Sequence, residues 1–353
     1  MGFLKNEDTA SVSVKVDGTE LPLKAYADLL SVSVRDDVDA ASMFELQLLT
    51  WDPDALTISW ADDALFKVGA EVEIQFGYVD RLATVMVGDI TGLELDFNAG
   101  ETPTLTVRGY DRSHRMSRGQ KTRVFAQARD SAIASQIAQS YGLRPSVVDT
   151  SVTFEYVMQN NQTDLEFLAE RASLIGYELL VADRTLHFRP KEDGAPAQLT
   201  LSVDEDLIEF HPRLTAGGQA GKVEVRGWNP DDKQVIVGTA STGQESSMGE
   251  LLGPRAADDA FGAATVIQVE RPVFSQAEAD QLALGLLLNM GRDFITGDGA
   301  CFGRTDLESG RLVRIEGLGT RFSGVYDVVS VRHTYAPRKG YRTAFSVRKN
   351  AMS

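Results

Sequence analysis

The sequence is poor in cysteine and in long hydrophobic runs. Its single cysteine, Cys301, can form no disulfide within the chain, and no cysteine pair is spaced to hold zinc. The longest apolar run, residues 282–290, is too short to cross a bilayer, and the first residues have no apolar core typical of a signal peptide. We therefore expect a protein that is made in the cytoplasm, needs no disulfide and does not insert directly into a membrane.

Positive charge is also scarce. The 353 residues include 35 Lys and Arg against 51 Asp and Glu, which gives a formal net charge of −16. Binding to nucleic acid requires a positive field around the phosphates, so this composition argues against a dedicated nucleic-acid-binding protein.

Motifs of known catalytic chemistry are missing too. There is no phosphate-binding loop of the GxxxxGK[ST] type, no serine in a GxSxG turn, and no HExxH pattern around the four histidines. We expect no catalytic residue, no metal site and no cofactor. If a catalytic hypothesis were tested, His333, Asp327 and Glu316 on the terminal strands would be replaced first, and we expect structural effects only.

The hydrophobic pattern is what the sequence has in abundance. Over the first hundred residues apolar side chains alternate with polar ones, as in Phe44, Leu46 and Leu48, which is typical of half-buried strands. The period changes to that of helices in the middle, where Asp130 is a candidate cap and Thr163 with Glu166 forms a capping box. Alternation returns after residue 209, interrupted by residues 241–263, which we expect to be a loop, and by a helix at 275–291.

These patterns predict a mainly β protein with an α+β insert. We expect two antiparallel β-barrel domains, at residues 1–112 and 193–353, flanking a small helical and hairpin domain at residues 113–192. The helix at 275–291 is an insertion in the second barrel.

One segment contradicts the acidic composition. Residues 108–125, here called the basic run, contain six Arg and Lys but one acid, Asp111. Three interpretations are open for it: contact with nucleic acid, a solvated or internally paired charged segment, and contact with acidic surfaces of a larger assembly.

Three stretches resemble one family in the same order. The segment "VRGYDRSHRMSRGQKTRVF" is similar to the end of the first barrel in the phage late control gene D family, related to the hub part of valine-glycine repeat protein G of type VI secretion. "QNNQTDLEFLAERASLIGYELLVADRTLHFRP" resembles the middle domain of that family. "VEVRGWNPDDKQVIVGTA" and "GLGTRFSGVYDVVSVRHTY" resemble its second barrel.

The resemblance implies a structural baseplate hub of a contractile tail or injection particle. Hubs of this family are homotrimers whose paired barrels form a quasi-sixfold ring, which adapts a threefold spike to a sixfold inner tube. The implied partners are a separate spike protein, the inner tube protein, baseplate wedge components and, where the particle carries it, effector cargo. Nucleic acid is not among the expected partners.

Within that reading the basic run belongs to an assembly interface. The candidate residues are Arg112, Arg115, Arg118, Lys121 and Arg123, because guanidinium groups pair well with carboxylates at interfaces. Two alternative functions remain open, a spike-associated cell-envelope hydrolase and a free-standing carbohydrate-binding β protein.

Overall fold

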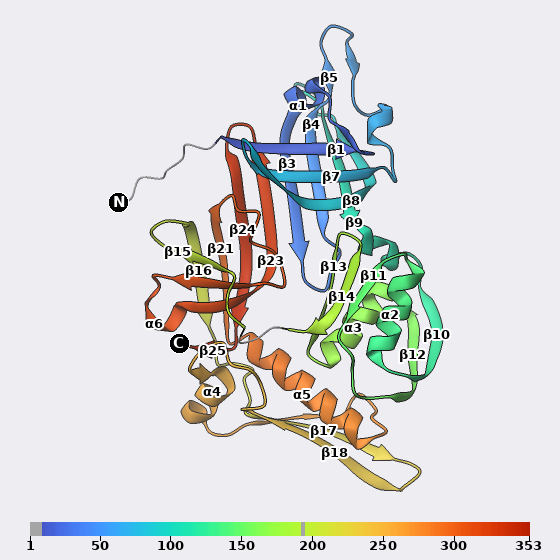
Figure 1. Ribbon diagram of the computed structural model, residues 1–353, viewed down its shortest axis with the longest axis vertical. Helices are drawn as coiled ribbons and strands as arrows, with labels where there is room; N and C mark the ends of the chain where they lie inside the picture. The colour runs from blue at the N-terminus through green and yellow to red at the C-terminus, as the bar shows by residue number, and fades with distance from the viewer. Residues whose placement is uncertain (1–8, 192–194) are drawn as a thin grey trace.

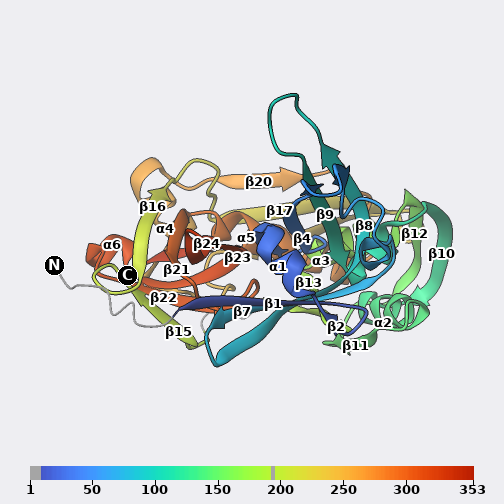
Figure 2. The ribbon, with the colours of Figure 1, turned by 90° about the horizontal axis from the view of Figure 1, so that it is seen from above.

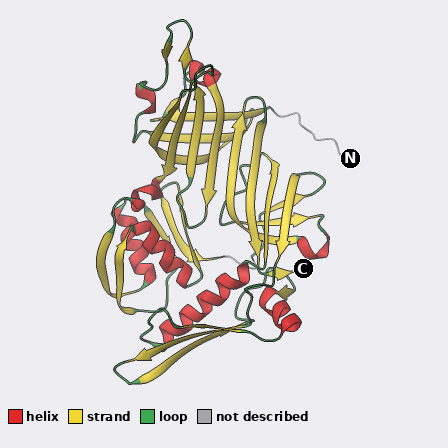
Figure 3. Cartoon of the chain, turned by 180° about the vertical axis from the view of Figure 1, so that it is seen from behind, coloured by secondary structure: helices red, strands yellow, loops and turns green. Residues whose placement is uncertain are grey.

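One large sheet runs through both β-rich parts of the chain (Figures 1 and 3). The computed structural model describes residues 9–191 and 195–353. Along the sheet the strands follow the order β16-β21-β24-β23-β3-β4-β9-β8-β7-β1-β2, with β22 on β23 and β15 on β22. Their bounds are β1 (Ala10–Val16), β2 (Thr19–Glu20), β3 (Leu29–Asp37), β4 (Met43–Leu49), β7 (Glu71–Tyr78), β8 (Arg81–Asp96), β9 (Thr104–Asp111), β15 (Leu199–Ser202), β16 (Leu207–Leu214), β21 (Ile295–Phe302), β22 (Leu312–Glu316), β23 (Gly324–Ala336) and β24 (Gly340–Lys349).

The alternation seen in the sequence fixes which face of each strand is buried. Phe44, Leu46 and Leu48 of β4 are fully buried, whereas Glu45 and Gln47 between them are partly exposed. Successive side chains of a strand point to opposite faces, so this pattern places the first apolar core on one side of the sheet.

The predicted mainly β, antiparallel character is confirmed, but the prediction that it forms two β-barrel domains is wrong as far as the barrels are concerned. Within the described residues the sheets are antiparallel for the most part, but none closes into a barrel through backbone pairing. The two β-rich parts are instead joined edge to edge, because β3 pairs antiparallel with β23 and places Val34 opposite His333. We call this pairing the seam. An edge strand exposes unpaired backbone groups, and each part satisfies the edge of the other.

The middle of the chain folds as the sequence predicts, with helices covering small sheets. Its elements are the short helix η2 (Arg112–Ser117), β10 (Lys121–Ala128) paired with β12 (Phe154–Gln162), the sheet β11 (Arg144–Val147), β14 (Thr185–Pro190) and β13 (Tyr177–Ala182), and the helices α2 (Asp130–Ser140) and α3 (Asp164–Leu174). The capping box of Thr163 and Glu166 is confirmed at the start of α3. The expected cap of α2 is not, since Arg129 occupies that position and Asp130 is the first helical residue.

A second layer holds the strands that were expected in the second barrel. β17 (Lys222–Asn229), β18 (Gln234–Ser241) and β20 (Thr265–Gln268) form their own sheet against the helix α5 (Gln276–Arg292), which confirms the third predicted helix. Ser275 caps α5 by accepting a hydrogen bond from the amide of Glu278.

Residues 241–263 are not simply a loop. They include β19 (Leu251–Leu252), which pairs with β25 (Ala351–Met352), and the helix α4 (Gly253–Phe261). A proline in the first turn favours a helix start, and Pro254 is such a signal. The remaining short elements are α1 (Leu23–Asp28), β5 (Trp51–Asp52), β6 (Thr57–Ile58), η1 (Ala64–Phe66) and α6 (Gly319–Phe322).

Two expectations fall outside the described residues. One is the expected absence of a signal peptide, which concerns the first eight residues. The other is the expected domain boundary between residues 192 and 193. In the part of the chain that the structure describes, no helix is both long and apolar enough to cross a membrane.

Candidate assembly site

The basic run begins where β9 turns into η2. Asp111, the last residue of β9, caps this short helix by accepting a hydrogen bond from the Ser113 amide at 2.7 Å, and it also accepts from the Ser42 amide at 3.0 Å. Burial raises the pKa of Asp111, while these hydrogen bonds act in the opposite direction. Asp111, the single acid of the basic run, therefore attaches the start of η2 to the backbone at Ser42.

The first two candidate arginines bind carboxylates of the first β-rich part. Arg112 forms an ion pair with Glu71, and Arg115 forms one with Asp89, with Nη2 and Oδ2 2.7 Å apart. The Asp89 side chain is buried, so Arg115 satisfies a carboxylate that water cannot reach freely.

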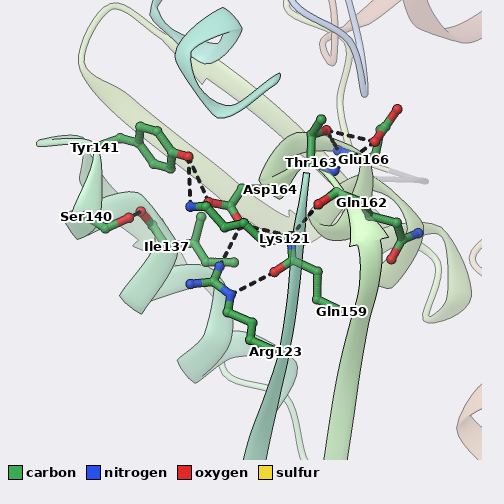
Figure 4. Close-up of polar contacts among 10 residues, drawn as sticks. All are labelled: Lys121, Arg123, Ile137, Ser140, Tyr141, Gln159, Gln162, Thr163, Asp164 and Glu166. Carbon is green, nitrogen blue, oxygen red and sulfur yellow. Dashed lines mark hydrogen bonds and ion pairs between the residues drawn. The ribbon is translucent and has the colours of Figure 1, made fainter. Parts of the chain in front are cut away.

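Lys121 and Arg123 converge on one buried carboxylate, that of Asp164 (Figure 4). Lys121 Nζ lies 2.5 Å from Asp164 Oδ2, and Arg123 Nη2 lies 2.6 Å from Oδ1. Tyr141 and Gln159 also donate hydrogen bonds to this carboxylate, at 2.8 and 3.0 Å. Burial favours the neutral acid, but the hydrogen bonds outweigh it and lower the pKa of Asp164.

The Asp164 cluster, as we call these five residues, attaches β10 to the start of α3. The hydrogen bond that Lys121 donates to Asp164 raises the pKa of Lys121, so both groups stay charged around neutral pH. A buried charge is tolerated when its partners satisfy it, and the arrangement is a structural clamp. Nothing local in the sequence links Asp164 to Lys121 and Arg123, which lie about forty residues away.

Arg118 differs from the other four candidates. It is exposed, and no described carboxylate lies within ion-pair distance of it. It borders a hollow of about 890 Å³ that Tyr110, His114 and Arg115 also line. Four of the five candidate cations are thus paired inside the chain, as the internally paired interpretation expects, and Arg118 is left available to a partner.

The three residues that a catalytic hypothesis would replace first, His333, Asp327 and Glu316, each have different contacts in the structure. His333 is buried, with Nδ1 2.7 Å from the Tyr341 hydroxyl. Asp327 accepts a hydrogen bond from Arg348 at 3.1 Å, and Glu316 is exposed at the end of β22. No group of three His, Cys, Asp or Glu side chains among the described residues is placed to hold a metal ion.

Comparison with known proteins gives one family match over most of the chain. The family model described as "Alg8 N-terminal domain" matches residues 6–336. No curated protein matches the sequence.

Solved structures share the fold at low sequence identity. A 43 kDa tail protein of prophage MuSo2 from Shewanella oneidensis has a TM-score of 0.73 and 15% identity, covering 98% of this chain and 100% of the other. A tail protein from Neisseria meningitidis MC58 has a TM-score of 0.70 and 12% identity, covering 97% of both chains. The E. coli c3393 protein, a component of the type VI secretion system, has a TM-score of 0.59 and 13% identity, covering 95% of this chain and 76% of the other. The chain therefore has the fold of phage tail proteins.

Proposed function

This chain belongs to the family described as the Alg8 N-terminal domain, and we propose that it is a structural hub protein of a tail baseplate. The observation that carries the proposal is the match to the Shewanella tail protein over 98% of this chain and all of the other. The likeness extends over nearly the whole of both chains, so both β-rich parts and the middle of this chain take part in it.

The hub is a homotrimer that adapts a threefold spike to a sixfold inner tube of a contractile tail or injection particle. The late control gene D resemblance supports this finer assignment, together with the two β-rich parts, which offer six similar units in a trimer. The role is structural and uses no catalytic residue. Its partners are the spike protein, the inner tube protein and the wedge components of the baseplate.

The division into residues 1–112, 113–192 and 193–353 is part of the same proposal. Three of the apolar clusters support it: one joins side chains from Val14 to Val107, another those from Met116 to Phe188, and a third those from Leu201 to Val347. Tyr341 packs in the first cluster, so the outer two parts share their core at the seam.

The mass of the complex in solution tests the proposal. The chain is co-expressed with a separate trimeric spike protein, and the purified complex is measured by light scattering. We expect three copies of this chain for each spike trimer. A free-standing carbohydrate-binding protein need not trimerise, and a complex that holds a single copy of the chain would refute the hub assignment.

A further inference from the structure

The seam carries two arginines directly opposite each other on its outer face. Arg332 of β23 is the cross-strand partner of Arg35 of β3. Like charges at opposed positions destabilise a sheet, so this pair costs stability in the isolated chain. Arg35 has an ion pair with Asp37 at 2.7 Å, but Arg332 is exposed and has no ion-pair partner among the described residues.

A third cation extends the pair. Arg342 of β24 is exposed and lies diagonally from Arg332, since Ala344 is the residue opposite Arg332. Arg35, Arg332 and Arg342 are here called the cation face. Arg35 and Arg332 line a hollow of about 390 Å³, together with four small residues. These residues are Gly299, Ser330, Ala344 and Ser346.

Two acids, Asp298 and Glu209, also line the hollow, but neither forms an ion pair with an arginine of the cation face among the described residues. Asp298 accepts a hydrogen bond from Ser346 at 2.7 Å, and Glu209 lies close to His211, 3.8 Å away. Asp298 lies on β21 and Glu209 on β16, and both strands are on the far side of β24 from Arg332. Arg332 and Arg342 therefore offer guanidinium groups without an ion-pair partner among the described residues, close to an open, shallow hollow, which suits carboxylates that enter from outside.

An acidic and apolar projection exists on the same chain. Residues 95–103, here called the finger, connect β8 to β9 and stand out from the body of the molecule (Figure 2). Leu95 and Phe97 are 47% and 67% exposed, and the finger contains Asp96 and Glu101 but no Lys or Arg. Among the described residues, Asp96 and Glu101 have Asn98 as a hydrogen-bond donor and no cation.

We propose that the finger of one copy docks on the cation face of the next copy, with Asp96 and Glu101 paired to the arginines and Phe97 seated in the hollow. The inference rests on the proposed trimer and deepens it. A second copy is the occupant because the finger acids and the arginines Arg332 and Arg342 are complementary in charge, and neither set has an ion-pair partner among the described residues of its own copy. The two surfaces differ, so the contact is head-to-tail, and in the proposed trimer three such contacts form the ring.

Disulfide trapping tests the contact directly. The variant Glu101→Cys with Arg332→Cys is co-expressed with the spike protein, oxidised and separated on a non-reducing gel. The native Cys301 is buried, so we expect it to form no disulfide with the introduced cysteines. We expect covalently linked dimers and trimers from the double variant and none from either single variant, because a head-to-tail contact places unlike positions together.

The mass of the same complex separates two kinds of failure. If three copies are present and the double variant gives no linked species, the finger contact is wrong while the hub assignment stands. If light scattering finds one copy, the hub assignment fails and the contact with it.

Charge exchange supplies a second readout that does not depend on cysteine chemistry. Changing Arg332 and Arg342 to Glu should raise the dissociation constant of the oligomer by about tenfold, and changing Asp96 and Glu101 to Lys should do the same. Combining all four changes should restore it, because opposite charges face each other again. Additive weakening in the combined variant would overturn the proposal.

Discussion

At the scale of single residues, Arg118 is the part of the basic run that can report on a partner. Arg112, Arg115, Lys121 and Arg123 are engaged with Glu71, Asp89 and Asp164, so reversing their charge would disturb the fold itself. Only the exposed Arg118 can be changed without breaking an ion pair that the structure describes.

We predict that Arg118→Glu lowers the yield of assembled particles severalfold while the isolated chain keeps its stability within about 0.5 kcal/mol. The control is Arg321→Glu, which reverses another exposed cation at the far end of the chain. Particle yields by electron microscopy and urea denaturation of the chain give the two readouts. Equal yields from both variants would leave the basic run as a purely internal element.

The Asp164 cluster shows what the sequence could and could not predict about the site. The excess of cations at residues 108–125 was evident, and so was the capping box that starts α3. The ion pairs of Lys121 and Arg123 with Asp164 could not be predicted, because they depend on β10 lying beside the first turn of α3. Local patterns predict the ends of elements, whereas an ion pair between distant segments requires their packing.

At the scale of elements, the start of α3 offers a clear measure of local stability. The Thr163 hydroxyl accepts a hydrogen bond from the Glu166 amide at 3.2 Å, and the Glu166 carboxylate accepts from the Thr163 amide at 2.9 Å. The Thr163 amide and the Thr163 hydroxyl both donate to the Glu166 carboxylate, and these two hydrogen bonds lower the pKa of Glu166. The box also fixes the position of Asp164, which is the next residue.

We predict that Thr163→Ala lowers the free energy of unfolding by about 1 kcal/mol, the usual cost of losing a cap. Thr163→Ser is the matched control, since it keeps the hydroxyl and should stay close to the wild type. Urea denaturation followed by circular dichroism measures both. Equal losses in the two variants would mean that the methyl group of Thr163, and not its hydroxyl, stabilises the helix start.

The lengths and caps of α4 and α5 explain why the sequence pattern predicted α5 but not α4. α5 has seventeen residues, an apolar face and a serine cap, all readable from the sequence. α4 has nine residues, no side-chain cap, and many small or acidic residues, so its pattern resembles a loop. Pro254 was the one local signal, and a single proline also fits a turn.

At the scale of the whole molecule, the sequence predicted strands but not the way in which they join. Alternation defines the buried face of each strand and is blind to which strand lies beside it. Nothing in the sequence around Val34 or His333 predicted that β3 and β23 pair, since these residues lie about three hundred positions apart in the chain. The mainly β character was predictable, and the continuous sheet across the seam was not.

The seam has a buried histidine at its centre, which makes its stability sensitive to acid. His333 packs 6.0 Å from the ring of Phe76 of β7, and its Nδ1 lies 2.7 Å from the Tyr341 hydroxyl and 3.2 Å from that of Thr343. Burial lowers the pKa of His333 to about 4, although Asp36 and Asp306 act in the opposite direction. The folded chain therefore keeps this ring neutral where an unfolded chain would take up a proton.

The sign of the pH dependence follows from that lowered pKa. Above the ordinary histidine value of 6.5 the ring is neutral in both states, and its contribution to stability is intact. As the pH falls from 6.5 to about 4, the unfolded chain binds a proton and the folded chain does not, so the contribution is lost progressively. The loss amounts to roughly 3 kcal/mol over that range.

We predict that His333→Gln, which keeps a polar side chain at the seam, is less stable than the wild type at neutral pH but loses less stability on acidification. The measurement is the free energy of unfolding in urea at several pH values between 6.5 and about 4. The difference between the two slopes isolates His333, because every carboxylate of the chain titrates in both proteins. Parallel curves would show that a proton reaches His333 without opening the seam, and the junction of the two β-rich parts would then not depend on a neutral ring.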